Sequence, residues 1–184
     1  MIQQAKKENI TNLSLLILNA IGTIANTLTG ENERNKILET LDLYISMDIN
    51  RISYNNIYTY KIENELAGLI IAYNSNKIKE LDTPILNHLK SKNMFFKSFD
   101  KECFKDEFYI DTVSVFEKFQ GNGIAKELFI FIEKKAKDLD FKKVSLLVDF
   151  ENQKALKLYE KIGFRKNSIL NVSKHNYHHM IKML

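Results

Sequence analysis

Residues 108–148 most restrict the fold, because a strand, a glycine-containing turn, a helix and a second strand follow one another there. Residues 108–115 (FYIDTVSV) have strand character, and residues 124–139 place apolar side chains at helical spacing. Residues 143–148 (KVSLLV) are almost continuously apolar, which is typical of a strand buried on both faces. A strand–helix–strand unit of this kind requires a crossover, so we expect its two strands to be parallel.

The remaining segments predict a mixed sheet flanked by helices. Short apolar or alternating runs predict five further strands, and the two that flank residues 63–65 should form an antiparallel hairpin. Apolar side chains at three-four spacing predict one helix over residues 13–28, with Asn9 or Thr11 as its cap. We therefore expect an α+β fold with a central, twisted, mostly antiparallel sheet of six or seven strands and four or five helices. The five strands are expected at residues 2–5, 57–61, 66–73, 165–170 and 177–183, and the other helices at residues 37–47, 81–89, 124–139 and 152–161.

Length and composition favour one soluble domain spanning residues 1–184. Hydrophobic residues make up 45% and charged residues 27% of the chain, as is usual for a globular protein. Lysines outnumber arginines 24 to 3, which argues against a nucleic-acid partner, because arginine is the preferred reader of bases and phosphates. The apolar stretch at residues 13–25 has a polar side and is too short to span a bilayer. We therefore expect a cytoplasmic protein without a membrane partner.

The middle and the end of the chain are harder to interpret. Residues 74–106 carry no motif, and the charged run at residues 100–106 is expected to be exposed. A single cysteine excludes an intramolecular disulfide and is interpreted as an ordinary, partly buried thiol. Neighbouring histidines on a strand face opposite sides, so we expect surface or substrate-edge histidines rather than a metal site. These residues are Cys103, His175, His178 and His179.

The turn Gln120-Gly121-Asn122-Gly123-Ile124-Ala125 lies between the strand and the helix of the central unit. Backbone N–H groups at a helix N-terminus lack intrahelical acceptors and favour an anion, and glycine lets the backbone approach a phosphate. A tight structural turn explains the glycines equally well. A dinucleotide fingerprint is disfavoured, because Lys126 replaces its third small residue and only 35 residues follow Asp149.

Three motifs in order resemble the GNAT superfamily of acetyl-CoA-dependent N-acetyltransferases. The family's coenzyme loop, Gln/Arg-x-x-Gly-x-Gly/Ala, is matched by Gln120, Gly123 and Ala125. An asparagine followed by Leu-Tyr-x-x-x-Gly-Phe is matched by Asn152 and residues 158–164. A terminal Tyr-x-x-Met-x-Lys is matched by Tyr177, Met180 and Lys182. The match is dense over residues 108–164, and it implies a GNAT-like fold and an acetyltransferase that uses acetyl-CoA as co-substrate.

The resemblance also implies a role for each matching residue. The strand end would pair by its backbone with the pantetheine arm of the coenzyme, as an added strand. The glycine turn would hold the pyrophosphate, and Asn152 would hydrogen-bond the coenzyme arm. Tyr159 would protonate the leaving thiolate as general acid. The implied coenzyme-binding residues are Val113, Ser114, Val115, Gln120, Gly121, Asn122, Gly123, Ile124, Ala125, Lys126 and Asn152.

The acceptor and the base are less defined. A cationic amine must lose a proton before it attacks, and Glu107, Asp111 and Asp149 lie on the two strands expected to splay around the acetyl group. A water chain is an alternative to each of them. The expected acceptor is a primary amine of a small molecule or a protein, and residues 74–106 would form an insertion over the active site. A non-catalytic acyl-CoA sensor on the same fold is the alternative function, and the oligomeric state is left open, a homodimer included.

Overall fold

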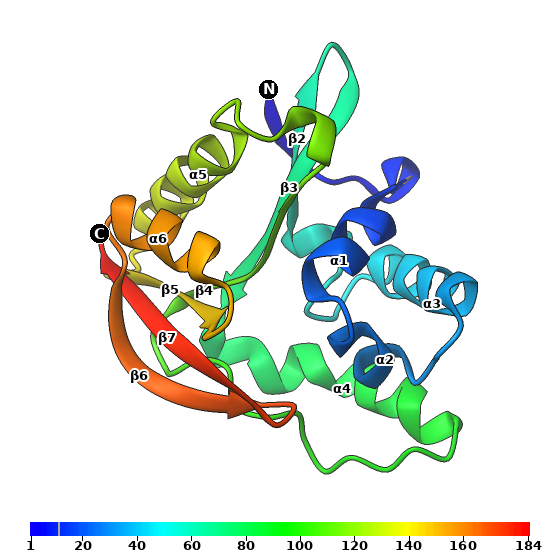
Figure 1. Cartoon of the computed structure of the whole chain (residues 1–184). Helices are drawn as coiled ribbons and strands as arrows, with labels where there is room; N and C mark the ends of the chain where they lie inside the picture. The colour runs from blue at the N-terminus through cyan, green and yellow to red at the C-terminus, as the bar shows by residue number, and fades with distance from the viewer. Residues whose placement is uncertain (11) are drawn as a thin grey trace.

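Seven strands form one sheet in the computed structural model, which describes residues 1–10 and 12–184 (Figure 1). The strand order is β1-β2-β3-β4-β5-β7-β6, and within these residues only β4 and β5 are parallel neighbours. The predicted mixed, mostly antiparallel sheet and its parallel pair are therefore confirmed. The strands are β1 (Ile2–Gln4), β2 (Ile57–Ile62), β3 (Glu65–Asn74), β4 (Phe108–Val115), β5 (Lys143–Asp149), β6 (Arg165–Val172) and β7 (His175–Met183).

Helices cover both faces of the sheet and bury two separate apolar clusters (Figure 1). The first four helices pack on one face, against side chains such as Leu69 and Ile71 of β3. The last two pack on the opposite face, where the alternate β3 side chains Ile70 and Ala72 point. The helices are α1 (Leu13–Ile21), α2 (Ile24–Thr29), α3 (Arg34–Ser46), α4 (Ile78–Ser91), α5 (Ile124–Asp138) and α6 (Gln153–Lys161).

The predicted single helix at residues 13–28 is in fact two helices. The backbone of Gly22 adopts φ 53° and ψ −126°, which glycine tolerates but which lies outside the helical region. Gly22 therefore ends α1. This break explains why the described residues contain six α-helices instead of the four or five expected. Asn12, and not the predicted Asn9, occupies the N-terminal cap position of α1. Asn9 lies in the short 3-10 turn that precedes the helix. The other predicted cap, Thr11, lies outside the described residues.

The 92–107 segment runs from the end of α4 to the start of β4. Contrary to expectation, residues 100–106 are not uniformly exposed: Cys103 is buried, and the side chain of Glu102 is 17% exposed because it pairs with Arg51. Asp100 accepts a hydrogen bond from the backbone N–H of Ser173 (2.9 Å), in the turn between β6 and β7. The segment therefore connects the α1–α4 side of the molecule to the C-terminal hairpin (Figure 1).

Candidate active site

The parallel strands β4 and β5 separate after three residue pairs, of which Ile110 and Leu146 are the last. At this point β4 also bulges against β3: Ile71 pairs with Thr112 and Ala72 with Ile110, so Asp111 is the extra residue. Beyond the bulge β4 is paired with β3 only, as far as the described chain shows. Residues 113–115 consequently present an open strand edge, which can pair with an extended ligand.

The glycine turn follows β4 after a short 3-10 turn (Glu117–Phe119) and leads into α5. Gly121 (φ 82°) and Gly123 (φ 77°) both have left-handed backbones, and a Cβ built on either would meet no atom within 4 Å. The Gln120 side chain donates to the backbone carbonyl of Val115 (3.1 Å), which holds the turn against the strand. The predicted turn is therefore open on the side where a ligand would approach.

The N-terminus of α5 has no side-chain cap, because Gly123 occupies the cap position. Its first backbone N–H groups therefore lack both an intrahelical acceptor and a capping oxygen. Ile124 is buried in the core, whereas Ala125 is half-buried and Lys126 is exposed. An anion bound here would meet backbone N–H groups, the positive end of the helix dipole and the lysine ammonium.

Tyr159 lies on α6, on the same face of the sheet as α5. Its ring packs edge-on against Phe129 of α5 (centroids 5.5 Å apart) and near Phe164 (6.1 Å). Burial raises the pKa of Tyr159 to about 12, so the hydroxyl stays protonated at neutral pH. No hydrogen bond joins this hydroxyl to any residue the structure describes. The phenol is therefore available as a donor to a ligand.

Asn152 is the N-terminal cap of α6: its Oδ1 accepts a hydrogen bond from the backbone N–H of Ala155 (3.0 Å). This leaves its amide NH₂ as the group that could bind the coenzyme. Asp149, at the end of β5, accepts from the backbone N–H of Glu151 (2.8 Å) and so shapes the turn before the helix.

Glu107 lies before the start of β4, away from the point where the strands separate, and its side chain is only 1% exposed. Its Oε2 accepts hydrogen bonds from the backbone N–H of Phe104 (2.9 Å) and the hydroxyl of Ser145 (2.8 Å), and lies 3.0 Å from Nε2 of His179. Burial opposes the charged form, but the hydrogen bonds from His179 and its other partners outweigh it and lower the pKa of Glu107. Glu107 therefore lies away from the bulge at which Asp111, the other predicted base on this strand, stands.

The C-terminal histidines differ from one another. His175 is exposed and His178 stacks on Phe150, but His179 is fully buried against Glu107, which corrects the expectation of a surface histidine. The alternation of β7 places His178 and His179 on opposite faces. Across residues 1–10 and 12–184, no group of three or more His, Cys, Asp or Glu side chains could hold a metal ion.

Asp111 belongs to an ionic cluster on the α1–α4 face that sequence reasoning did not find. The guanidinium of Arg51 contacts Asp82 (2.7 Å), Glu102 (2.8 Å) and Asp111 (3.8 Å), and Tyr73 donates to Asp111 (2.5 Å). One signal was available: Arg51 is one of only three arginines in a lysine-rich chain. Arginine is preferred where several carboxylates must be held in fixed geometry.

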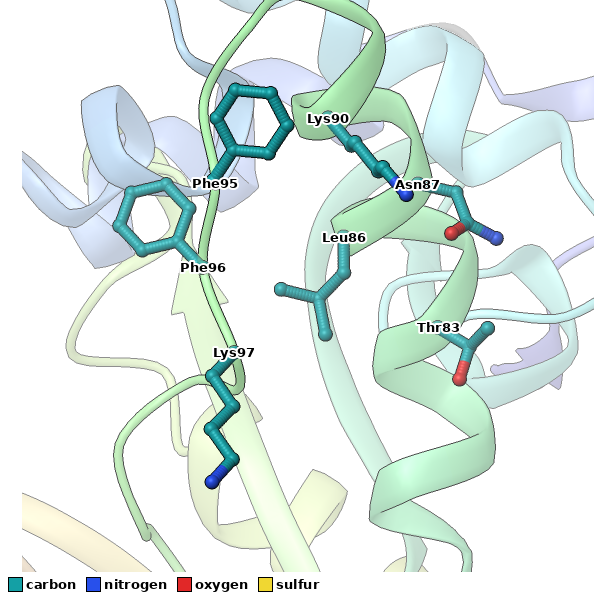
Figure 2. A pocket seen from close by; sticks show the side chains of 7 residues that line it. All are labelled: Thr83, Leu86, Asn87, Lys90, Phe95, Phe96 and Lys97. Carbon is teal, nitrogen blue, oxygen red and sulfur yellow. The ribbon is translucent and has the colours of Figure 1, made fainter.

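A separate hollow lies between α4 and the beginning of the 92–107 segment (Figure 2). Figure 2 shows Phe95 and Phe96 on the segment that runs opposite Leu86 of α4, with the Phe95 ring turned toward the helix and the Phe96 ring away from it. None of the predicted site residues lines it. Among the described helices, none combines the length and the apolar character needed to cross a membrane.

The splayed parallel strands, the bulge and the uncapped helix that follows agree with the GNAT-like fold that the resemblance implied. The model of the acetyltransferase (GNAT) family matches residues 29–164, and the chain belongs to this family of enzymes. The family's general reaction is acetylation with acetyl-CoA as donor.

Individual relatives agree with this membership. The chain is 32% identical over 66 residues to a protein named uncharacterized N-acetyltransferase YycN from Bacillus subtilis; the match covers 36% of this chain and only 42% of that relative. A solved acetyltransferase structure is similar over 100% of this chain and 98% of its own, with 29% identity and a TM-score of 0.82. An N-acetyltransferase from Staphylococcus aureus Mu50 is similar over 98% and 99%, with 27% identity and a TM-score of 0.75.

Proposed function

We propose that this protein transfers an acetyl group from acetyl-CoA to a primary amine by direct attack of the amine. The observation that carries the proposal is the separation of β4 and β5 at the Asp111 bulge, followed twelve residues later by the uncapped N-terminus of α5 at Gly123. An extended coenzyme arm could pair with the free edge of Val113, Ser114 and Val115, while the backbone of residues 120–126 binds its pyrophosphate. The amide of Asn152 is available for a further hydrogen bond to the arm.

Bound acetyl-CoA supplies a thioester carbonyl that an amine can attack, so that a C–N bond forms, the C–S bond breaks and the sulfur leaves as a thiolate. Backbone N–H groups at the bulge of β4 would stabilise the oxyanion that develops. Tyr159 would donate its phenolic proton to the thiolate, because the hydroxyl is protonated and unpartnered among the described residues.

The proton of the incoming ammonium needs an acceptor. Asp111 lies where the strands separate, with a side chain that is 10% exposed, whereas Glu107 is enclosed by its hydrogen-bond partners. Burial raises the pKa of Asp111 even though Arg51 opposes this effect, which brings the carboxylate closer to the range of an efficient base at neutral pH. Asp111 is therefore the preferred base, with Glu107, Asp149 or a water chain as alternatives.

Residues 1–184 are proposed to act as a single acetyltransferase domain, supported by the one continuous sheet. The alternative function, a non-catalytic acyl-CoA sensor, would use the same binding surface. A coenzyme-release assay across a panel of amines separates the two, because a sensor binds acetyl-CoA but releases no free coenzyme A.

Acetyl-CoA is expected to stabilise the folded protein. At 100 times its dissociation constant, a ligand that binds only the folded state adds about 2.7 kcal/mol. For a chain of this size such a gain raises Tm by about 5–10 °C, which thermal unfolding at increasing coenzyme concentration measures. A nicotinamide dinucleotide is the matched control, since it also carries a pyrophosphate. A shift with the dinucleotide and none with millimolar acetyl-CoA would contradict the coenzyme assignment.

Cationic amines are expected to be acetylated in preference to neutral hydroxyl acceptors. Asp111 stands at the bulge where the strands separate and Asp149 ends β5, and carboxylates at these positions would attract an ammonium. The measurement is initial rate over a panel of polyamine-like amines, aminoglycoside-like amines, and peptides with a free α-amine or lysine. Transfer to an alcohol, with every amine inactive, would refute this acceptor class.

A further inference from the structure

Arg51 is the centre of a largely buried cluster in which acidic side chains outnumber basic ones three to one. Its side chain is 6% exposed, and three carboxylates surround it: Asp82 from α4, Glu102 from the 92–107 segment and Asp111 from β4. An ion pair that served stability alone would need one carboxylate, since each additional buried charge costs desolvation energy. The surplus of acidic groups beside the opening between β4 and β5 therefore calls for a functional explanation.

Asp111 is held in a fixed orientation within this cluster. Its Oδ2 accepts the hydroxyl proton of Tyr73 (2.5 Å) and lies 3.8 Å from Nη1 of Arg51, while its Oδ1 accepts from the hydroxyl of Thr112 (3.0 Å). Each carboxylate oxygen can accept a second hydrogen bond. The carboxylate thus keeps a free lone pair even though it cannot rotate, and it stands on the bulge where β4 leaves β5.

We propose that Arg51 and Tyr73 are positioning residues for acetyl transfer, which hold the Asp111 carboxylate at the strand opening so that it can take the proton of the acceptor ammonium. This inference rests on the proposed function and adds two residues to it. Neither residue needs to touch the substrate. Arg51 offsets part of the negative charge of the three carboxylates, and Tyr73 directs the Asp111 carboxylate by a short hydrogen bond.

The proposal predicts the direction of a pH effect. The hydrogen bond from Tyr73 stabilises the charged form of Asp111, so its loss raises the pKa of this carboxyl group further. The Asp111 carboxylate is then protonated at a higher pH. The acidic limb of the pH profile of kcat/KM therefore moves to higher pH. The titratable groups that surround Asp111 are Arg51 before β2, Tyr73 on β3, Tyr109 on β4, Glu102 and Cys103 on the 92–107 segment and, through Arg51, Asp82 on α4.

The test compares Tyr73→Phe with Tyr109→Phe. Both tyrosines are buried, their rings pack against each other 5.7 Å apart, and each donates to a carboxylate of the cluster, but Tyr109 donates to Glu102 instead of Asp111. Tyr73→Phe is expected to move the acidic limb of kcat/KM for the amine upward by about one pH unit or more, the effect of losing one hydrogen bond to a charged group. Tyr109→Phe is not expected to raise it. The KM for acetyl-CoA should stay unchanged in both variants.

Arg51→Met would leave three buried carboxylates without a cation and is expected to prevent folding, so the decision rests on the tyrosine pair. Carboxyl ¹³C NMR titration of Asp111 in the resting protein gives the same pKa comparison without turnover. An NMR shift in Tyr73→Phe with an unmoved kinetic limb, or no shift in either measurement, overturns the positioning role. A wild-type protein that acetylates no amine would instead refute the proposed function, and this inference with it.

Discussion

Tyr159→Phe is expected to lower kcat by about 10²-fold or more, the usual contribution of a positioned general acid. The substitution removes one hydroxyl and keeps the ring, whose edge-on contacts with Phe129 and Phe164 are apolar. The KM for acetyl-CoA should change much less, because the lost interaction strengthens only in the transition state. Since product release can limit turnover, single-turnover kinetics is the decisive measurement.

Tyr44→Phe is the matched control for this experiment. Tyr44 is also buried, but it lies on α3 and donates to the backbone carbonyl of Leu28 (3.3 Å), on the opposite face of the sheet. The control should lose stability and keep its rate. An unchanged single-turnover rate in Tyr159→Phe would mean that this tyrosine serves packing and that another group protonates the thiolate.

Gly123→Val is expected to abolish measurable binding of acetyl-CoA while the protein remains folded. The glycine has φ 77° and borders open space, so a branched side chain meets no protein atom directly but would cover the N–H groups at the start of α5. Losing even two hydrogen bonds to a charged phosphate, at about 1.5–3 kcal/mol each, weakens binding by about 10²-fold or more. Isothermal titration with acetyl-CoA measures this loss.

Gly22→Val separates the loss of the binding surface from general backbone strain. Gly22 likewise has a positive φ (53°), and its Cβ position is likewise free of contacts, but it lies between α1 and α2. Both variants carry a strained backbone at a cost of about 1–3 kcal/mol. Normal coenzyme affinity in Gly123→Val, or an equal loss in Gly22→Val, would show that the turn does not hold the pyrophosphate.

The sequence predicted most of the fold because its strands and helices carry strong local patterns. The bounds of β4 and the parallel β4–β5 pair follow from alternation, a buried apolar run and the length of the helix between them. The break at Gly22 was missed because the apolar periodicity continues from α1 into α2, and a single glycine does not reveal its backbone angles. Local sequence patterns therefore predicted where helices and strands lie better than they predicted breaks within a helix.

The residues of the candidate site were predicted only where a local sequence pattern carries them. The glycine turn, Asn152 and Tyr159 are encoded within one continuous stretch whose spacing is visible in the sequence. The cluster around Arg51 is not, because its partners Asp82 and Glu102 lie 31 and 51 positions away and meet it only in the folded chain. The burial of Glu107 against His179, 72 positions away, escaped prediction in the same manner.

The short ladder between β4 and β5 also has a mechanical consequence. These strands join β1–β4 to the β5–β7–β6 half of the sheet through three residue pairs, whereas β4 shares seven pairs with β3 and β5 shares seven with β7. A bending motion of one half against the other breaks the fewest interstrand hydrogen bonds at this seam. The proposed coenzyme opening therefore adjoins the shortest of these three strand ladders, so the two halves of the sheet are joined there chiefly by side chains, such as Glu107 with Ser145 and His179.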